Sequence, residues 1–201
     1  IDHMIEQSII GLSVQQLNAK GKHKGSTDYD LACTLKKMYE DSFVSSSIKS
    51  NEWWFIKDHY WIKDDSGTTL RRNISTSMRP LYHNKAMDKL QKAMQIRTAE
   101  GTVDTENDEY QLLIAQCNYL RDIADRLGNT KDKENIMREA REIFFDRDFT
   151  KKLDTRRDLL CFTNGVYDFS TDEFRPGKPE DYISKCTQHQ FRELDEEQDK
   201  D

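Results

Sequence analysis

The aromatic stretch NEWWFIKDHYWIKDD, residues 51–65, restricts the fold more than any other part of this chain. It holds all the tryptophans of the protein, and its two apolar runs, WWFIK and YWIKD, are separated only by Asp58-His59. Two such runs joined by two residues are typical of a β-hairpin. Histidine enters the left-handed backbone region at some cost, so a longer or bulged turn is the alternative to a tight one.

The register of this hairpin decides whether its rings are core or surface. A two-residue turn places Ile56 opposite Trp61 and Phe55 opposite Ile62, so both faces are apolar near the turn. A solvent-facing platform usually has one apolar and one polar face. We therefore predict a buried hairpin, with a base-stacking surface as the alternative. Under that alternative the candidate rings are Trp53 and Tyr60.

Helical periodicity dominates much of the remaining chain. A helix is expected over residues 28–41, with Asp28 as its N-cap. A longer helical stretch covers residues 68–97, and Pro80 should kink or divide it. The inward positions expected in this stretch are Leu70, Ile74, Met78, Leu81, Leu90, Met94 and Arg97.

The stretch LLCFTNGVYDFSTDEFRPGKPEDYIS, residues 159–184, predicts a second β-element. Asn164-Gly165 favours a type I′ hairpin turn, which needs a positive φ at both positions. A short third strand is expected at Phe174-Arg175, and PEDYI should add a helical turn. The predicted fold class is thus mainly α with small β-hairpin elements (α+β), a helical domain carrying an aromatic hairpin and a C-terminal β-meander.

Composition and motifs exclude several classes of function. The phosphate-binding loop GxxxxGK[ST], the GxSxG nucleophile elbow and HExxH are all missing from the sequence, and the four cysteines form no CxxC pair. We therefore expect no catalytic residue, no metal site and no cofactor in this segment. The net charge of −6 is concentrated in an acidic tail, residues 188–201, whereas residues 1–26 read as a flexible segment around the basic loop KGKHKGST.

The strongest basic concentration lies in the stretch 68–97. It is either a solvated helix face or a surface that contacts phosphates without reading sequence. The candidate nucleic-acid-binding residues are Arg71, Arg72, Arg79, Lys85, Lys89 and Lys92, with Lys20, Lys22 and Lys24 as a secondary flexible patch.

Two interpretations from other classes stay open. In the first, the chain is a docking or oligomerisation module without affinity for nucleic acid. It would act through two helices within residues 110–145, which a short turn after Gly128 should join as an antiparallel pair. In the second, the chain is a metal-dependent nuclease, although groups crowded around one hairpin turn seldom converge on a metal. The ligands of that site would be Asp58, His59, Asp64 and Asp65.

The C-terminal stretch TNGVYDFSTDEFRPGKPEDYIS resembles a motif of the poxvirus-type primase–helicases of viruses, giant viruses and phages. The upstream segment DYDLA, residues 28–32, and the aromatic hairpin are similar to the same family, so the resemblance covers about residues 27–187. The positions that carry the motif, expected to be structural, are Asn164, Gly165, Asp168, Arg175 and Asp181.

This resemblance implies a pre-helicase domain over residues 27–187, lying before a superfamily 3 helicase domain in a larger protein. It implies a role in viral DNA replication inside the host cell, with no membrane partner. The expected partners are single-stranded or forked DNA, further copies of the chain in a hexamer, and the adjacent primase and helicase domains. ATP and magnesium are expected for the parent helicase and not for this segment, and residues 188–201 would lead toward the helicase.

Overall fold

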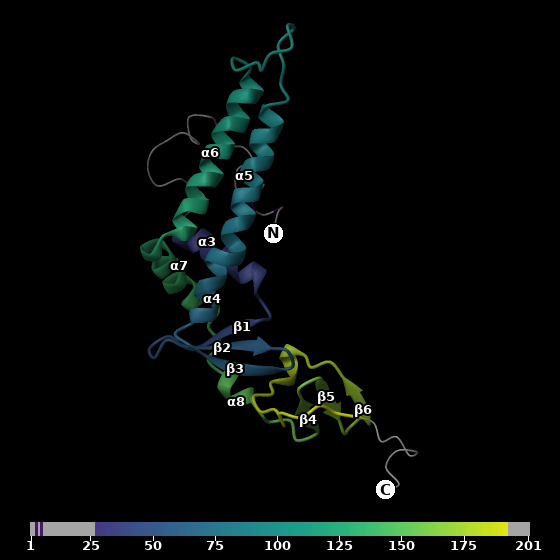
Figure 1. Ribbon diagram of the computed structural model, residues 1–201. Helices are drawn as coiled ribbons and strands as arrows, with labels where there is room; N and C mark the ends of the chain where they lie inside the picture. Colours follow the sequence, from purple (N-terminus) through teal and green to yellow (C-terminus); the bar gives the residue numbers. More distant parts are fainter. Residues whose placement is uncertain (1–2, 4, 6–26, 193–201) are drawn as a thin grey trace. The chain divides into compact units, whose positions relative to one another are not determined.

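The computed structural model describes residues 3, 5 and 27–192 of the chain (Figure 1). The expectations for residues 6–26 and 193–201 lie outside this described part. The chain divides into two compact units. We call residues 1–40 and 68–143 the helical unit, and residues 41–67 and 144–201 the sheet unit, and each is described by itself.

The helical unit contains α3 (Asp28–Met38), α4 (Thr68–Asn73), the π-helical segment η1 (Ile74–Met78), α5 (Arg79–Ala93), α6 (Asp108–Gly128) and α7 (Thr130–Ile143). Helices α5 and α6 lie side by side along most of their length (Figure 1), and α3 packs against α7. Fully buried apolar side chains from these helices form the core: Leu31, Leu35, Leu70, Ile74, Met78, Leu120, Ile123, Leu127 and Ile136.

Helix α3 begins one residue earlier than its predicted cap implies. Thr27 is the N-cap: its hydroxyl accepts from the backbone N–H of Asp30 at 3.2 Å, and the Asp30 carboxylate accepts from the Thr27 N–H at 3.1 Å. This reciprocal pair is a capping box. The prediction of Asp28 as the cap was wrong, and its carboxylate instead pairs with Arg126 of α6 at 2.6 Å.

The predicted interruption near Pro80 is confirmed and takes the form of the π-helical segment. Pro80 lies in the first turn of α5, immediately after η1, where its missing N–H costs little. A π-turn adds one residue to the helical repeat and so rotates everything that follows. The buried face therefore continues at Tyr82, Ala86, Lys89 and Ala93. The predicted buried positions Leu70, Ile74 and Met78 are confirmed. Beyond them the predicted buried face is one residue out of phase. Leu81 and Leu90 are only half-buried, and Met94 and Arg97 are exposed.

Helices α6 and α7 do not form the predicted antiparallel pair. Their connection is the single residue Asn129, which ends α6 and whose side chain accepts from the N–H groups of Lys131 and Asp132 at the start of α7. So short a link leaves no room for α7 to fold back along α6. Helix α6 pairs with α5 instead, and α7 with α3.

The sheet unit contains two three-stranded antiparallel sheets. The first comprises β1 (Phe43–Ser47), β2 (Glu52–Lys57) and β3 (Tyr60–Asp65), and the second β4 (Leu159–Phe162), β5 (Gly165–Asp168) and β6 (Glu173–Arg175), with the short helices α8 (Phe149–Lys152) and η2 (Pro179–Asp181). The tight aromatic hairpin is confirmed in its predicted register, and Asp58, not His59, takes the positive φ of 55°. The predicted class, mainly α with small β-elements, is also confirmed.

The Asn164-Gly165 turn is not the predicted type I′ turn. Gly165 pairs with Phe162, so the turn residues are Thr163 and Asn164, and neither has a positive φ. Glycine is needed at 165 for a different reason. A Cβ there would lie 2.4 Å from Cζ of Phe174 and 2.8 Å from the carbonyl oxygen of Arg175.

Phe149 of α8 packs between the first sheet and the segment that follows η2. Its ring lies 4.9 Å from that of Trp61 and 6.0 Å from that of Tyr182. The Trp61 indole N–H donates to the carbonyl of Pro179 at 2.9 Å, and the Trp61 backbone N–H donates to that of Ile183 at 2.7 Å. The aromatic hairpin is therefore core of the sheet unit, as predicted.

Candidate nucleic-acid interface

The aromatic hairpin offers little surface to a base. Trp53 is fully buried, its ring 5.8 Å from that of Phe144, and its indole N–H donates to Asn51. The stacking interpretation was therefore wrong for Trp53, because a buried ring has no face for a base. Tyr60 is half-buried and packs against the apolar cluster of Cys161, Val166 and Ile183.

The basic residues of α4 and of the start of α5 fall into two groups. Arg71 is half-buried and pairs with Glu134 of α7 at 3.2 Å. Arg72 and Arg79 are exposed. Arg79 lies over the last residue of α6, since a Cβ on Gly128 would meet the Arg79 guanidinium at 3.1 Å. A cation at the C-terminus of a helix is stabilised by the helix dipole.

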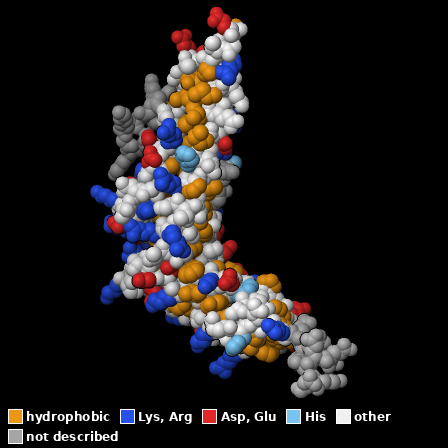
Figure 2. Space-filling view, viewed as in Figure 1, with side chains coloured by type: hydrophobic (Ala, Val, Ile, Leu, Met, Phe, Trp, Pro, Cys, Tyr) orange, Lys and Arg blue, Asp and Glu red, His pale blue; other side chains and the backbone are white. Residues whose placement is uncertain are grey.

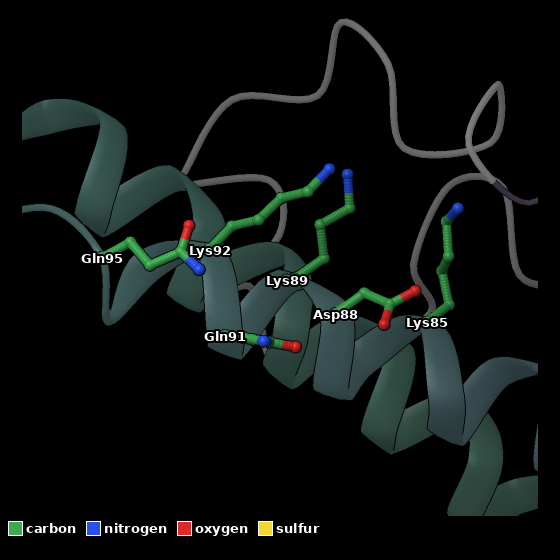
Figure 3. Close-up of a pocket in the computed structure, with 6 residues that line it drawn as sticks. All are labelled: Lys85, Asp88, Lys89, Gln91, Lys92 and Gln95. Atoms are coloured by element: carbon green, nitrogen blue, oxygen red, sulfur yellow. The ribbon is translucent and has the colours of Figure 1, made fainter.

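Three lysines of α5 lie on one face of the helix. Lys85, Lys89 and Lys92 follow the spacing i, i+4, i+7 and line a shallow hollow of about 290 Å³, together with Asp88 (Figure 3). Seven residues of helix span about 10 Å. Lys89 is only 8 % exposed, whereas Lys92 is exposed. On the face shown in Figure 2, Lys and Arg side chains are spread over both units, with Asp and Glu side chains among them.

The structure thus brings part of the predicted basic set together. Lys85, Lys89 and Lys92 share one hollow, and Arg72 and Arg79 are exposed earlier in the same helical stretch. Arg71 is held by an ion pair within the helical unit. The secondary patch of Lys20, Lys22 and Lys24 lies outside the described residues.

The charged residues of the C-terminal motif form a buried ion-pair network. Arg175 binds Asp181 through both guanidinium nitrogens at 2.8 Å each and reaches Asp168 at 3.3 Å. Asp168 and Asp181 are 5 % and 4 % exposed, and Arg156 approaches both of them. A bidentate arginine–carboxylate pair fixes geometry as well as charge.

The pKa values in this network show how tightly the charges are held. Burial opposes ionisation of Asp181, but hydrogen bonds from Arg175 and from the Lys178 N–H outweigh it and hold its pKa below the ordinary value. The pKa of Asp168 is also lowered, first by the hydrogen bond from the Ser170 hydroxyl. The pKa of Arg175 is raised by its bonds to Asp181. The network therefore remains charged at neutral pH.

Asn164, the remaining polar residue of the motif, forms hydrogen bonds with the backbone near the end of the described chain. Its amide oxygen accepts from the Phe191 N–H at 2.9 Å, and its amide nitrogen donates to the Phe191 carbonyl at 3.1 Å. Asn164 thus pairs with a backbone as a neighbouring strand would. Asn164, Gly165, Asp168, Arg175 and Asp181, the positions quoted for the motif, thus all have a packing or pairing role in the sheet unit.

A family model described as "D5 N terminal like" matches residues 32–200. The chain belongs to this D5 N-terminal-like family. The matched range contains the whole C-terminal motif and the basic stretch of α4 and α5.

Relatives of this D5 N-terminal-like chain come from large DNA viruses. A protein of Acanthamoeba polyphaga mimivirus named "Putative helicase L207/L206" is 30 % identical over 172 residues, and one of Frog virus 3 named "Putative helicase 022R" is 25 % identical over 182 residues. The matches cover 86 % and 79 % of this chain but only 17 % and 18 % of those proteins. The chain therefore spans less than a fifth of the length of either relative.

The nuclease interpretation finds no support in the geometry of the D5 N-terminal-like chain. Asp58 and His59 lie at the turn of the aromatic hairpin, whereas Asp64 and Asp65 lie at its far end, about 17 Å away along five strand residues. His59 Nδ1 accepts from the Gly177 N–H at 3.1 Å. Among the described residues, no three histidine, cysteine or acidic side chains are placed to hold a metal ion.

None of the described helices is long and apolar enough to cross a membrane.

The sequence interpretation missed one surface of the sheet unit. Leu160, Phe162, Tyr167 and Phe174 alternate along the strands with buried residues, and they share the outer face of the β4–β5–β6 sheet. Most antiparallel sheets present polar side chains on the face away from the core. The sequence signal that could have predicted this surface was the presence of apolar residues on both faces of these strands.

Proposed function

We propose that this chain is a non-catalytic module of a viral replication primase–helicase that contacts DNA through the phosphate backbone. Membership of the D5 N-terminal-like family and the helicase names of its viral relatives support the replication context. The observation that carries the DNA contact is the shared face of Lys85, Lys89 and Lys92 together with the exposed arginines of the same helical stretch.

The chemistry of this surface fits phosphates and not base edges. Lysines act as point charges on flexible stems, and half-buried Lys85 and exposed Lys92, about 10 Å apart along the helix, can contact phosphates of one strand. Such contacts are independent of sequence and sensitive to salt. The parent protein would supply ATP and magnesium binding in its helicase domain, work as a hexamer within the infected cell, and place this module next to its primase and helicase domains.

The test is DNA binding across a salt series with a charge-neutralising variant. Arg72→Gln, Arg79→Gln and Lys92→Gln together remove three exposed cations, which should weaken binding to single-stranded and forked oligonucleotides about tenfold at low salt. The slope of log affinity against log salt should fall by about 2 for single strands, at ~0.7 per lost phosphate contact.

A matched control separates a specific surface from general charge loss. Lys49→Gln with Lys57→Gln removes two exposed cations of the sheet unit, and it should change neither the affinity nor the slope. An unchanged salt slope in the α4–α5 variant would refute the phosphate-contact proposal.

A docking module remains the second candidate, because two methionines of α5 are exposed. Met87 and Met94 are 46 % and 42 % exposed, and Met-rich surfaces adapt readily to partner proteins. Size-exclusion chromatography over a concentration series decides between the two. A concentration-dependent oligomer without DNA affinity would favour docking, whereas a DNA-binding monomer would favour the phosphate contact.

A further inference from the structure

The outer face of the β4–β5–β6 sheet is an aromatic cleft of about 410 Å³ in the sheet unit. Phe169 is 60 % exposed and Leu160 39 % exposed, both unusually high for large apolar side chains that adjoin one another. The cleft is lined by Leu160, Phe162, Tyr167, Phe169, Asp172, Phe191 and Arg192.

The rings of this cleft form a connected row. Tyr167 lies 5.0 Å from Phe169 and 5.3 Å from Phe191, measured between ring centroids. Phe191 in turn stacks on Phe174 at 4.5 Å with an interplanar angle of 18°. The ring of Phe174 occupies the space that a side chain at position 165 would need.

Two charged side chains line the cleft, Asp172 and Arg192. The Tyr167 hydroxyl donates to Asp172, which occupies that carboxylate. Arg192 adds an exposed cation to the lining. A guanidinium beside aromatic faces suits a ligand that is flat, has a π-face and carries negative charge nearby.

We propose that this aromatic cleft stacks the bases of single-stranded nucleic acid, with Arg192 beside the phosphate of the bound strand. The proposal rests on the DNA contact proposed above and adds a second contact of different chemistry. Sheets with exposed aromatic rings bind single strands in this manner, because every base has a face that can stack.

A peptide strand fits this surface less well. Strand addition needs an open sheet edge. The outer edge of β4 is already occupied, since the Thr187 N–H donates to the Cys161 carbonyl and the Thr163 N–H donates to the His189 carbonyl. The opposite edge, β6, is only three residues long.

The experiment compares a single-stranded oligonucleotide with an abasic one of equal length, which keeps the phosphates and lacks the bases. The intact chain should bind the base-containing strand about tenfold more tightly. Phe169→Ala should lose most of this preference while binding the abasic strand as before. A 2-aminopurine in the strand should be quenched by the intact chain and not by the variant.

Two further variants sharpen the result. Phe169→Leu keeps an apolar side chain but removes the ring, so it should lose the preference as Phe169→Ala does. Tyr29→Ala removes an equally exposed ring, 56 % exposed, from the helical unit, and it should change nothing. Because Phe169 is exposed, neither Phe169→Ala nor Phe169→Leu should lower the melting temperature appreciably.

Each contrary outcome has a distinct meaning. Equal binding of abasic and base-containing strands, with the salt slope intact, would overturn the stacking site and leave the phosphate contact standing. Full preference in Phe169→Leu would also overturn it, because the preference for bases would then not depend on the Phe169 ring. Absence of any DNA binding at low salt would refute the proposed function, and the stacking site with it.

Discussion

Replacing Gly165 by alanine should destabilise the sheet unit, although the change adds a single methyl group. The new Cβ would lie 2.4 Å from the Phe174 ring and 2.8 Å from the Arg175 carbonyl oxygen. The ring could rotate away. The carbonyl could not, because it belongs to β6, which is paired with β5 through Val166 and Arg175. The sheet must therefore shift, or the strands must separate.

The expected cost follows from the measured range for overpacking. Forcing an extra methyl into a packed site costs about 1–3 kcal/mol, and a contact with fixed backbone belongs at the upper end, so we expect ~2 kcal/mol or more. For a chain of this size that lowers the melting temperature by about 4–8 °C. Thermal unfolding followed by near-UV circular dichroism measures it.

A double-mutant cycle isolates the cause. Phe174→Ala removes the nearest contact, so the destabilisation by Gly165→Ala should be smaller in that background than in the intact chain. Gly101→Ala is the control for adding a methyl group: its Cβ would meet nothing within 4 Å, and only its positive φ of 84° would cost energy. Gly165→Ala unfolding within about 0.5 kcal/mol of the intact chain would refute the steric reasoning.

Further predictions concern the ion-pair network and the first helix cap. Asp181→Asn should cost about 2 kcal/mol, because it removes the charge from the bidentate hydrogen bonds between half-buried Arg175 and a buried carboxylate; urea unfolding measures this, and a loss below ~1 kcal/mol would contradict it. The folded-state pKa of Asp181 lies below its ordinary 3.8, so its contribution to the free energy of unfolding should be full above about pH 5 and be lost as the pH falls through the folded-state pKa. The Asp181→Asn variant should lack that part of the pH dependence of stability. Thr27→Ala should cost about 1 kcal/mol by removing the capping box with Asp30, whereas Thr27→Ser should restore stability; equal melting temperatures for all three chains would argue against the cap.

The parts of the fold that local pattern determines were predictable from sequence. The hairpin of residues 52–65 has the expected register because a period-two pattern and a two-residue gap leave little choice. The helix break before Pro80 follows from the missing N–H of proline. The buried face beyond it did not follow, because a π-turn carries no clear sequence signature and shifts the phase by one residue.

The sequence predicted which basic residues belong to the candidate site, but not how they are arranged or which of them are paired. Charge clustering identified the basic stretch, but it could not show that Arg71 is engaged by Glu134, 63 residues away. Likewise the Asn164-Gly165 pair carried a strong local turn preference, which tertiary contacts with Phe174 and Phe191 overrode. The aromatic cleft was missed because its rings come from separate strands and meet only in the folded sheet.

The bond between the Trp61 indole and the Pro179 carbonyl joins residues 118 positions apart, with residues 68–143 of the helical unit encoded between them. On a ribosome that adds about 5–20 residues per second, the aromatic hairpin waits roughly 6–24 s for its packing partner. During that interval its apolar faces are uncovered while α4 to α7 emerge and can fold. The order of synthesis therefore exposes the tryptophans of the nascent chain to chaperones. A circular permutant opened between α5 and α6 would bring the two segments of the sheet unit closer in sequence and shorten that delay.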